Sequence, residues 1–514
     1  MIITELFCTF AREMISDELK YRIREAFVHV PTLEQEQAIE TFCRFMTDRT
    51  EHAVMILRGS AGTGKTTLAA AMVRALLSLN QALVLLAPTG RAAKVFSLYA
   101  EHPAYTIHRR IYRQKSLEGG FDLNYNKSHD TLFIVDEASM ISTSTDASLS
   151  LPHSSLSSFS SSLLDDLVRF VYNERNCRLL LIGDRAQLPP VGEERSPALQ
   201  SEVLRGYGLH VHECDLNEVL RQSQESGILW NATQIRTEET INESGRIALP
   251  KIHFKGFTDI QVVPGNELIE ALATSYSRVG KDETMVVTRS NKRANIYNLG
   301  IRNQVLDMEG ELCSGDRLMI VKNNYSVPLP PAEGKGDDGQ TAHPAGEATG
   351  MGSFIANGDI AVVRRVRNIH ELYGFHFAEV TMTFPDYHDY ELTATVLLDT
   401  LTSKAPALTR EQQEELYNKV MEDYEDIPLK ADRLKKVKED KYYNALQVKF
   451  AYAATCHKAQ GGQWQHVYID QGYMTDDMLT TDYMHWLYTA MTRATEKLYL
   501  VNWPKTQTAD NEET

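Results

Sequence analysis

Short apolar runs alternate with helical segments along this chain from Pro31 onward. Parallel sheets covered by helices give this pattern, because their strands are buried on both faces. Four of the runs end in glycine, proline, threonine or a carboxylate: AVMILRG, ALVLLAPT, TLFIVDE and CRLLLIGD. Ligands bind at the carboxyl edge of such sheets, so the pattern predicts one composite site at that edge.

A second α/β region begins near Leu204 and includes ETMVVTRSNKRANIYNLGIR, which predicts a strand followed by a helix. It resumes at VKFAYAATCHKAQ and ends with KLYLVNW. Three runs between these two parts alternate like the strands of a small barrel: GDIAVVRRV, FAEVTMTF and YELTATVLL. The second α/β domain is therefore predicted to be interrupted by a β insertion.

Length and composition describe a large globular protein. The 514 residues exceed the size at which one hydrophobic core stops growing, so we expect two large domains and a smaller insertion. No apolar run approaches the roughly 20 residues that span a bilayer, and charges interrupt the N-terminal segment, which predicts an amphipathic helix. Six cysteines without a CxxC pair disfavour a zinc ribbon and a disulfide framework. We expect a cytoplasmic protein without membrane contact.

Acidic and low-complexity stretches are predicted to carry no chemistry. The net charge of −16 argues mildly against nucleic acid, but the local distribution of charge decides that question. The serine-rich stretch 142–162 predicts a flexible loop or a weak helix. The Gly/Pro-rich stretch 326–352 predicts a disordered loop.

A phosphate-binding loop is the most specific signal in the chain. Residues 59–66 spell GSAGTGKT, directly after the strand AVMILR and before the helix TLAAAMVRALLSL. Backbone N–H groups and the helix N-terminus in such a loop cradle phosphates, Lys65 reaches the outer phosphates and the Thr66 hydroxyl coordinates Mg²⁺. The flanking strand and helix disfavour the alternative, a glycine-rich turn with an accidental lysine. The predicted cofactors are ATP and Mg²⁺.

Polar side chains also follow the third and fourth of these apolar runs. Asp136 and Glu137 end the apolar run LFIV, where a bound cation would offset the cost of burying a carboxylate. Asp136 is predicted to hold Mg²⁺ and Glu137 to orient or deprotonate the attacking water. Gln187 in IGDRAQLPPVG is a candidate sensor of the γ-phosphate, because an amide can both donate and accept. The alternatives are a pair of capping carboxylates and a polar turn stiffened by proline.

Two arginines far from this loop are further candidates. Arg221 lies in EVLRQ and Arg493 in YTAMTRATEKL. An arginine delivered across a domain interface stabilises transition-state charge. On the sequence alone, a surface helix position is the more common setting for each.

Several strings occur in one order: PTLEQEQAI, GSAGTGKT, APTGRAAK, TIHR, VDEAS, GDRAQLPPVG, LRQ, YAATCHKAQGG and YTAMTRA. Together they resemble superfamily 1 helicases, and most closely the RecD-like and Dda-like helicases of the 5′-to-3′ branch, over residues 31 to 503. The Asp-Arg-Ala-Gln at 184–187 and the Ala-Gln-Gly at 459–461 distinguish this branch from UvrD-like and RNA-decay helicases.

The resemblance implies roles for matching residues. It implies that Gln37, in preference to Gln35, contacts adenine, and that Arg221 and Arg493 reach the γ-phosphate when the domains close. The nucleotide-binding set would be Gln37, Gly59, Ser60, Ala61, Gly62, Thr63, Gly64, Lys65, Thr66, Thr67 and Gly461. Contacts to the nucleic-acid strand would come from Pro88, Thr89, Lys94, Thr106, His108, Thr455, His457 and Lys458. As an alternative, His108 and His457 are ordinary core histidines.

The resemblance also implies a domain plan of two RecA-like domains. The first covers 31–203 after an N-terminal helical extension at 1–30, and it carries a hairpin insertion at about 109–128. The second covers 204–311 and 441–505, on either side of an SH3-like insertion at 312–440. An acidic tail, 506–514, follows. In similar helicases the hairpin splits the duplex, with Phe121 as the candidate wedge here, and a plain surface hairpin is the alternative.

The expected function is ATP-dependent 5′-to-3′ movement on single-stranded DNA, coupled to unwinding at junctions between single and double strands. One rival is a nucleic-acid-stimulated ATPase subunit of a recombination or repair complex that translocates without unwinding. Another rival is a nucleotide switch or scaffold that does not move, and RNA is an alternative track. Monomeric action is the default, with repair or replication proteins as candidate partners.

Overall fold

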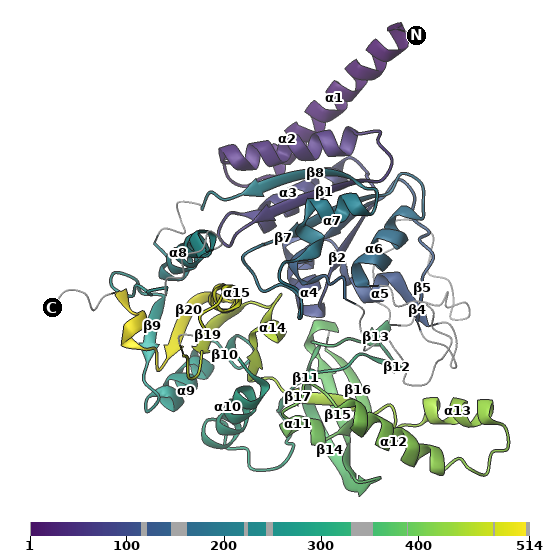
Figure 1. Cartoon of the computed structure of the whole chain (residues 1–514), viewed down its shortest axis with the longest axis vertical. Coiled ribbons are helices and arrows are strands. Elements are labelled where there is room, and N and C mark those ends of the chain that lie inside the picture. Colours follow the sequence, from purple (N-terminus) through teal and green to yellow (C-terminus); the bar gives the residue numbers. More distant parts are fainter. Residues whose placement is uncertain are drawn as a thin grey trace.

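The computed structural model describes residues 2–114, 121–144, 162–219, 225–242, 250–329, 353–387, 389–475 and 478–509. It contains two parallel α/β sheets and a closed β barrel, with the first sheet in the upper part of Figure 1 and the barrel at the bottom. The predicted fold class, two parallel sheets flanked by helices with a β insertion, is confirmed. Within the described ranges, no helix has the length and apolar character needed to cross a bilayer.

Two helices precede the first sheet. The N-terminal segment forms α1 (Ile2–Ala26), as predicted, and Leu19, Ile23 and Phe27 bury their side chains against the first domain. α2 (Leu33–Thr47) begins with a capping box, because the Thr32 side chain accepts from the Gln35 N–H while the Gln35 side chain accepts from the Thr32 N–H. This cap fixes where α2 starts.

The first sheet has the strand order β3-β2-β6-β7-β1-β8, and neighbouring strands are parallel. Alternate residues of β1 pack on opposite faces, Met55 and Leu57 with α2 and α3, and Val54 and Ile56 with α6. The strands are β1 (Ala53–Gly59), β2 (Leu83–Ala87), β3 (Ala104–Thr106), β6 (Leu132–Val135), β7 (Arg178–Gly183) and β8 (His210–Leu216). The helices are α3 (Lys65–Ser78), α4 (Gly90–Ala100), α5 (Ile107–Ile111), α6 (Leu163–Tyr172) and α7 (Ser201–Gly206), with 3-10 turns η1 (Ala138–Met140) and η2 (Pro197–Leu199).

The structure changes one sequence prediction for this domain and confirms another. β8 pairs with β1, so the first sheet continues beyond Leu204, where the second region was expected to begin. β4 (Tyr112–Gln114) and β5 (Phe121–Leu123) pair antiparallel, which confirms the two strands of the predicted hairpin. Its turn at Gly119 and Gly120 lies outside the described residues, as does most of the serine-rich stretch, 145–161.

The second sheet has the order β18-β10-β19-β20-β9 and is also parallel. Its strands are β9 (Ile260–Val263), β10 (Thr284–Thr288), β18 (Ala453–Thr455), β19 (Trp464–Asp470) and β20 (Ala494–Val501). Its helices are α8 (Gly227–Asn242), α9 (Leu268–Arg278), α10 (Asn291–Gln304), α14 (Cys456–Ala459) and α15 (Thr481–Met491), and a 3-10 turn η6 (Lys505–Gln507) follows β20.

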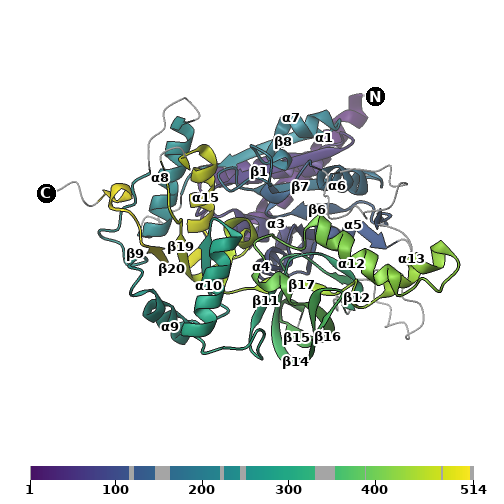
Figure 2. The ribbon, with the colours of Figure 1, turned by 60° about the horizontal axis from the view of Figure 1, so that its bottom comes forward.

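The β insertion is a closed barrel of β11 (Arg317–Ile320), β14 (Ile360–Leu372), β15 (Phe375–Phe384), β16 (Tyr390–Leu397) and β17 (Leu446–Phe450). β17 was expected in the second RecA-like domain, yet it pairs with β11 and β16 and completes the barrel. Figure 2 shows α12 (Arg410–Glu422) and α13 (Lys430–Glu439) extending from one side of the barrel. The smaller elements are β12 (Asn324–Leu329), β13 (Ser353–Ile355), η4 (Pro385–Tyr387) and α11 (Asp399–Thr402). Residues 330–352 of the predicted Gly/Pro-rich loop lie outside the described residues.

Candidate nucleotide site and strand-contact residues

The glycine-rich loop after β1 folds tightly back on itself. The N–H and the hydroxyl of Thr63 both donate to the Ser60 carbonyl, at 3.3 and 2.8 Å. A Cβ at Gly59 would lie 2.8 Å from both Lys65 Cγ and Thr63 Oγ1, so only glycine fits there without movement. Gly64, the N-cap of α3, has a φ of 79°. The loop and the start of α3 contain these predicted nucleotide-binding residues: Gly59, Ser60, Ala61, Gly62, Thr63, Gly64, Lys65, Thr66 and Thr67.

Acidic side chains from two neighbouring strands flank this loop. Lys65 Nζ donates to the Ser60 carbonyl at 3.0 Å and lies 4.0 Å from Asp184 Oδ2, just beyond β7. Asp136 follows β6, and burial, together with the nearby Glu137 carboxylate, raises its pKa to about 7. Glu137 has a left-handed backbone (φ 53°), and its N–H donates to Asp136 Oδ1 at 2.8 Å. The carboxyl edge of the first sheet therefore combines a phosphate loop with desolvated carboxylates.

Asp136 and Thr66 fit the predicted Mg²⁺ chemically. A carboxylate taken out of water without a cation is unfavourable in its charged form, and the raised pKa of Asp136 reflects this. Carboxylate and hydroxyl oxygens are the donors that Mg²⁺ accepts. When bound, the ion would neutralise phosphate charge at this edge of the sheet.

The second domain reaches the phosphate loop through α15. The Tyr488 hydroxyl accepts from the Ala61 N–H at 2.8 Å and donates to Asp184 Oδ2 at 2.6 Å. Next to it, Thr489 Oγ1 accepts from the Leu188 N–H at 2.7 Å. A nucleotide phosphate that takes the Ala61 N–H must therefore displace the Tyr488 hydroxyl.

Two arginines of the second domain, Arg493 and Arg236, occupy different places in the structure. Arg493 is buried, and its guanidinium donates to carbonyls of Thr489 and Gly462 in its own domain, so the structure does not bring it to the phosphate loop. Arg221 lies outside the described residues. Arg236 of α8 was not predicted, yet its Nη1 donates to Ser60 Oγ at 2.6 Å. No sequence pattern distinguished Arg236 from an ordinary helix arginine, because its position depends on the packing of α8 against α15.

The two glutamines considered for adenine, Gln37 and Gln35, lie in different surroundings. Gln37 is exposed on α2, whereas Gln35 is buried and its Nε2 donates to the Thr63 carbonyl of the phosphate loop at 2.9 Å. Thr32 and Gln35 together form the capping box at the start of α2. The capping signal places Gln35 in the first turn, on the side that faces the loop, so Gln35 is a second candidate for the nucleotide while the role of Gln37 stays a prediction.

Gln187 lies where the two domains meet. It is buried, and Gln460 Nε2 donates to Gln187 Oε1 at 3.4 Å and to the Leu188 carbonyl at 2.9 Å. Gly461, predicted for the nucleotide, instead abuts α4: a Cβ there would lie 3.1 Å from Thr89 Oγ1. The turn after β7 thus touches the segment that follows α14.

The strand-contact residues predicted in the first domain lie beyond the carboxyl ends of β2 and β3. The hydroxyls of Thr89 and Thr106 cap α4 and α5, accepting from the Ala92 and Arg109 N–H groups. Lys94 Nζ forms an ion pair with Asp386 of the barrel insertion, at 2.9 Å. Pro88 and His108, also predicted to contact the strand, are half-buried in the same region.

The strand-contact residues predicted in the second domain lie around α14. Thr455 is its N-cap, and His457 is exposed. Lys458 Nζ is buried and finds no hydrogen-bond partner among the described residues. Burial and the neighbouring Lys449 lower the pKa of Lys458 to about 8. A buried ammonium without a partner suits an anionic ligand.

Two family models match the chain, one in each α/β domain. Residues 32–150 match the AAA domain, and residues 450–501 match the UvrD-like helicase C-terminal domain. The ATP-dependent RecD2 DNA helicase of Deinococcus radiodurans is 32% identical over 141 residues. Over that stretch the chain is similar to a RecD-like helicase. The two matched segments contain the phosphate loop and α15, which meet through Ala61 and Tyr488.

The other similarities are partial or distant. The RecD2 alignment covers 27% of this chain and 16% of the relative. A Pif1 helicase from Bacteroides, solved with ADP-AlF3 and ssDNA, is 14% identical, with a TM-score of 0.44 over 93% of this chain and 94% of the other. The Pif1 helicase of Candida albicans is 15% identical, with a TM-score of 0.39 over 94% and 97%. Scores this low support no statement about the function of this chain.

Proposed function

We propose that this chain is an ATP-driven motor that moves 5′ to 3′ along single-stranded DNA and unwinds the duplex ahead of it. The contact that carries the proposal is the Tyr488 hydroxyl, which bonds both the Ala61 N–H and Asp184. Binding and release of a nucleotide at the loop would act directly on α15 of the second domain. A two-domain site that closes and opens with the nucleotide state is what a translocating motor requires.

The types of the predicted strand-contact residues support single-stranded DNA as the track. The residues predicted to grip the strand belong to both domains, and these meet where Gly461 contacts Thr89. Hydroxyls and cations hold phosphate and sugar without reading the bases, which suits a moving enzyme. The matching relative is named as a DNA helicase.

In the proposed cycle, each residue of the nucleotide site has one role. Lys65 neutralises the outer phosphates, and Glu137 orients or deprotonates the attacking water. Arg236, already hydrogen-bonded to Ser60, adds positive charge from the second domain as the domains close. Gln187 transmits the presence of the γ-phosphate to Gln460 through their direct contact. Loss of the γ-phosphate weakens these contacts and allows the domains to separate.

The test is unwinding by the purified chain of two matched DNA duplexes, one with a 5′ and one with a 3′ single-stranded tail, with and without ATP. We expect ATP-dependent strand separation only from the 5′ tail. Separation from the 3′ tail alone would reject the direction. ATPase activity stimulated by single-stranded DNA, without strand separation from either tail, would favour a translocating subunit of a larger complex.

Lys65→Ala is the control for the ATP requirement. It removes the ammonium that faces the phosphates, so hydrolysis and unwinding should be lost. Single-strand binding should persist, because the residues predicted to grip the strand lie elsewhere. Retained ATP hydrolysis in this variant would contradict the assignment of the phosphate loop.

A further inference from the structure

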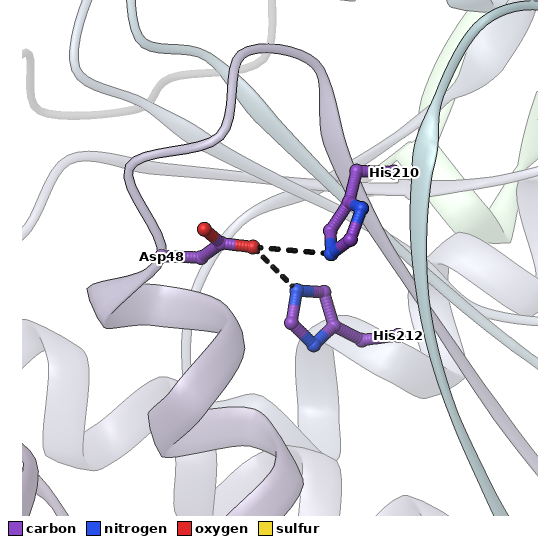
Figure 3. A group of neighbouring side chains, drawn as sticks. All are labelled: Asp48, His210 and His212. Atoms are coloured by element: carbon purple, nitrogen blue, oxygen red, sulfur yellow. Dashed lines mark hydrogen bonds and ion pairs between the residues drawn. The ribbon is translucent and has the colours of Figure 1, made fainter.

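Three side chains of types that bind metal ions meet at the amino edge of the first sheet, opposite the carboxyl edge that holds the phosphate loop. Asp48 is the C-cap of α2, and His210 and His212 are alternate residues of β8. Alternate residues of a strand point to the same face. Figure 3 shows both imidazole rings directed at one carboxylate oxygen of Asp48.

The spacing of their ligand atoms matches a single metal ion. Asp48 Oδ2 lies 2.8 Å from His212 Nε2 and 3.6 Å from His210 Nε2, and the ligand atoms of the three residues all lie within 4.8 Å of one another. Zinc ligands at about 2.0–2.1 Å in a tetrahedral site are roughly 3.3 Å apart. Small side-chain rotations would therefore bring all three atoms to bonding distance. We propose that Asp48, His210 and His212 bind one divalent transition-metal ion, with zinc preferred.

The surroundings hold the ligands in place and leave one side open. Asp48 Oδ1 accepts from the Thr50 N–H and hydroxyl, at 2.9 and 2.7 Å, so Oδ2 faces the histidines. The side chains of Asp48 and His212 are 16% and 17% exposed, whereas that of His210 is 52% exposed. A solvent molecule can complete the four ligands on the His210 side. The Arg178 guanidinium donates to the Asp48 backbone carbonyl, so it leaves the carboxylate available.

The ion would clamp α2 to β8 at one end. At its other end, α2 is already joined to the region after β8, because Glu34 Oε2 accepts from the Asn217 and Glu218 N–H groups. Gln35, one residue further, contacts the phosphate loop. A 15-residue helix is about 22 Å long, so the site lies far from the nucleotide and acts as a positioning element for α2.

The test uses the untagged full chain, freed of metal with a chelator and kept in excess Mg²⁺. ZnCl₂ is titrated by calorimetry against wild type, His210→Ala and His212→Ala. The matched control is His376→Ala, which removes a half-exposed histidine that pairs with a single carboxylate, Asp399, at 3.1 Å. The visible spectrum of Co²⁺-loaded protein then reports ligand geometry.

We expect wild type and His376→Ala to bind one more zinc ion per chain than His212→Ala. His210→Ala should bind at least tenfold more weakly than wild type, and since its ring is half-exposed, its loss should not disturb the fold. The Co²⁺ spectrum should show four-coordinate bands without thiolate charge transfer. The proposal is overturned if wild type takes up no zinc under these conditions. It is equally overturned if both histidine variants match wild type in stoichiometry and affinity, or if the Co²⁺ spectrum shows thiolate ligation.

Discussion

Replacement of Lys458 by methionine should stabilise the fold and weaken binding of single-stranded DNA. The Lys458 ammonium is buried without a hydrogen-bond partner among the described residues, and its pKa is lowered from 10.5 to about 8. One pKa unit corresponds to about 1.4 kcal/mol, so the buried charge costs up to about 3 kcal/mol at pH 7. Methionine fills the same space without the charge. The free energy of unfolding at pH 7 should therefore rise by up to about 3 kcal/mol in Lys458→Met.

The stability cost of the buried Lys458 charge depends on pH. Below pH 8 the lysine is charged in both the folded and the unfolded chain, so the full cost is present. Between pH 8 and 10.5 the folded chain has lost the proton that the unfolded chain keeps, so the cost falls and then disappears. The advantage of Lys458→Met should shrink over the same interval, as followed by melting temperature at pH 7, 9 and 10.5.

A DNA-binding measurement shows whether the buried Lys458 ammonium contacts the strand or is only unfavourable for the fold. Fluorescence anisotropy of a labelled oligonucleotide across salt concentrations should show weaker binding by Lys458→Met. The slope against log salt should be lower by roughly 0.7, the value for one phosphate contact on a single strand. Lys436→Met, at an exposed position on α13, is the control and should change neither property. A less stable Lys458→Met at pH 7, or an unchanged salt slope, would refute the reasoning.

Three further predictions concern Gln35, Arg236 and the ion pair between Lys94 and Asp386. Gln35→Ala should raise the KM for ATP and lower the free energy of unfolding by about 1–3 kcal/mol, because it leaves buried polar groups unpaired, whereas the exposed Gln37→Ala should do neither. Equal effects of the two changes on ATPase kinetics and melting temperature would contradict this assignment. Arg236→Gln should lower the ATPase kcat at least about tenfold while leaving the melting temperature nearly unchanged, and an unchanged kcat would exclude Arg236 from the site. Asp386→Asn should release Lys94 and raise affinity for single-stranded DNA about two- to fivefold at low salt only, as measured by anisotropy, since an exposed ion pair contributes about 0.2–1 kcal/mol. Affinity that does not change at low salt would show that this ion pair does not restrain binding.

The sequence predicted the strand–loop–helix geometry of residues 59–66, because local backbone conformation determines it. The phosphate loop needs glycine at fixed positions between a strand and a helix, and those residues are adjacent in the chain. Asp136 follows an apolar strand and was predicted for the same reason. Arg236 could not be predicted, because only the packing of α8 on α15 brings it to Ser60.

Boundaries between sheets were harder to predict than the strands themselves. The run from Leu446 to Thr455 was assigned as a whole to the second α/β domain. In the structure, β17 belongs to the barrel and β18 to the second sheet, with two residues between them. β8 carries polar residues and lies at an edge, so its sequence gave no sign that it extends the first sheet. Strand pairing is a long-range property, and local patterns do not determine it.

The turn after β7 connects the proposed nucleotide site with the residues proposed to contact the nucleic-acid strand. The Leu188 N–H donates to Thr489 Oγ1, while the Leu188 carbonyl accepts from Gln460 Nε2. Thr489 is adjacent to Tyr488, which contacts the phosphate loop, and Gln460 is two residues from Lys458. The backbone N–H and C=O of one residue of the first domain, Leu188, are therefore both bonded by the second domain. In the proposed cycle, displacement of Tyr488 by a nucleotide would reach α14 through these two hydrogen bonds to Leu188.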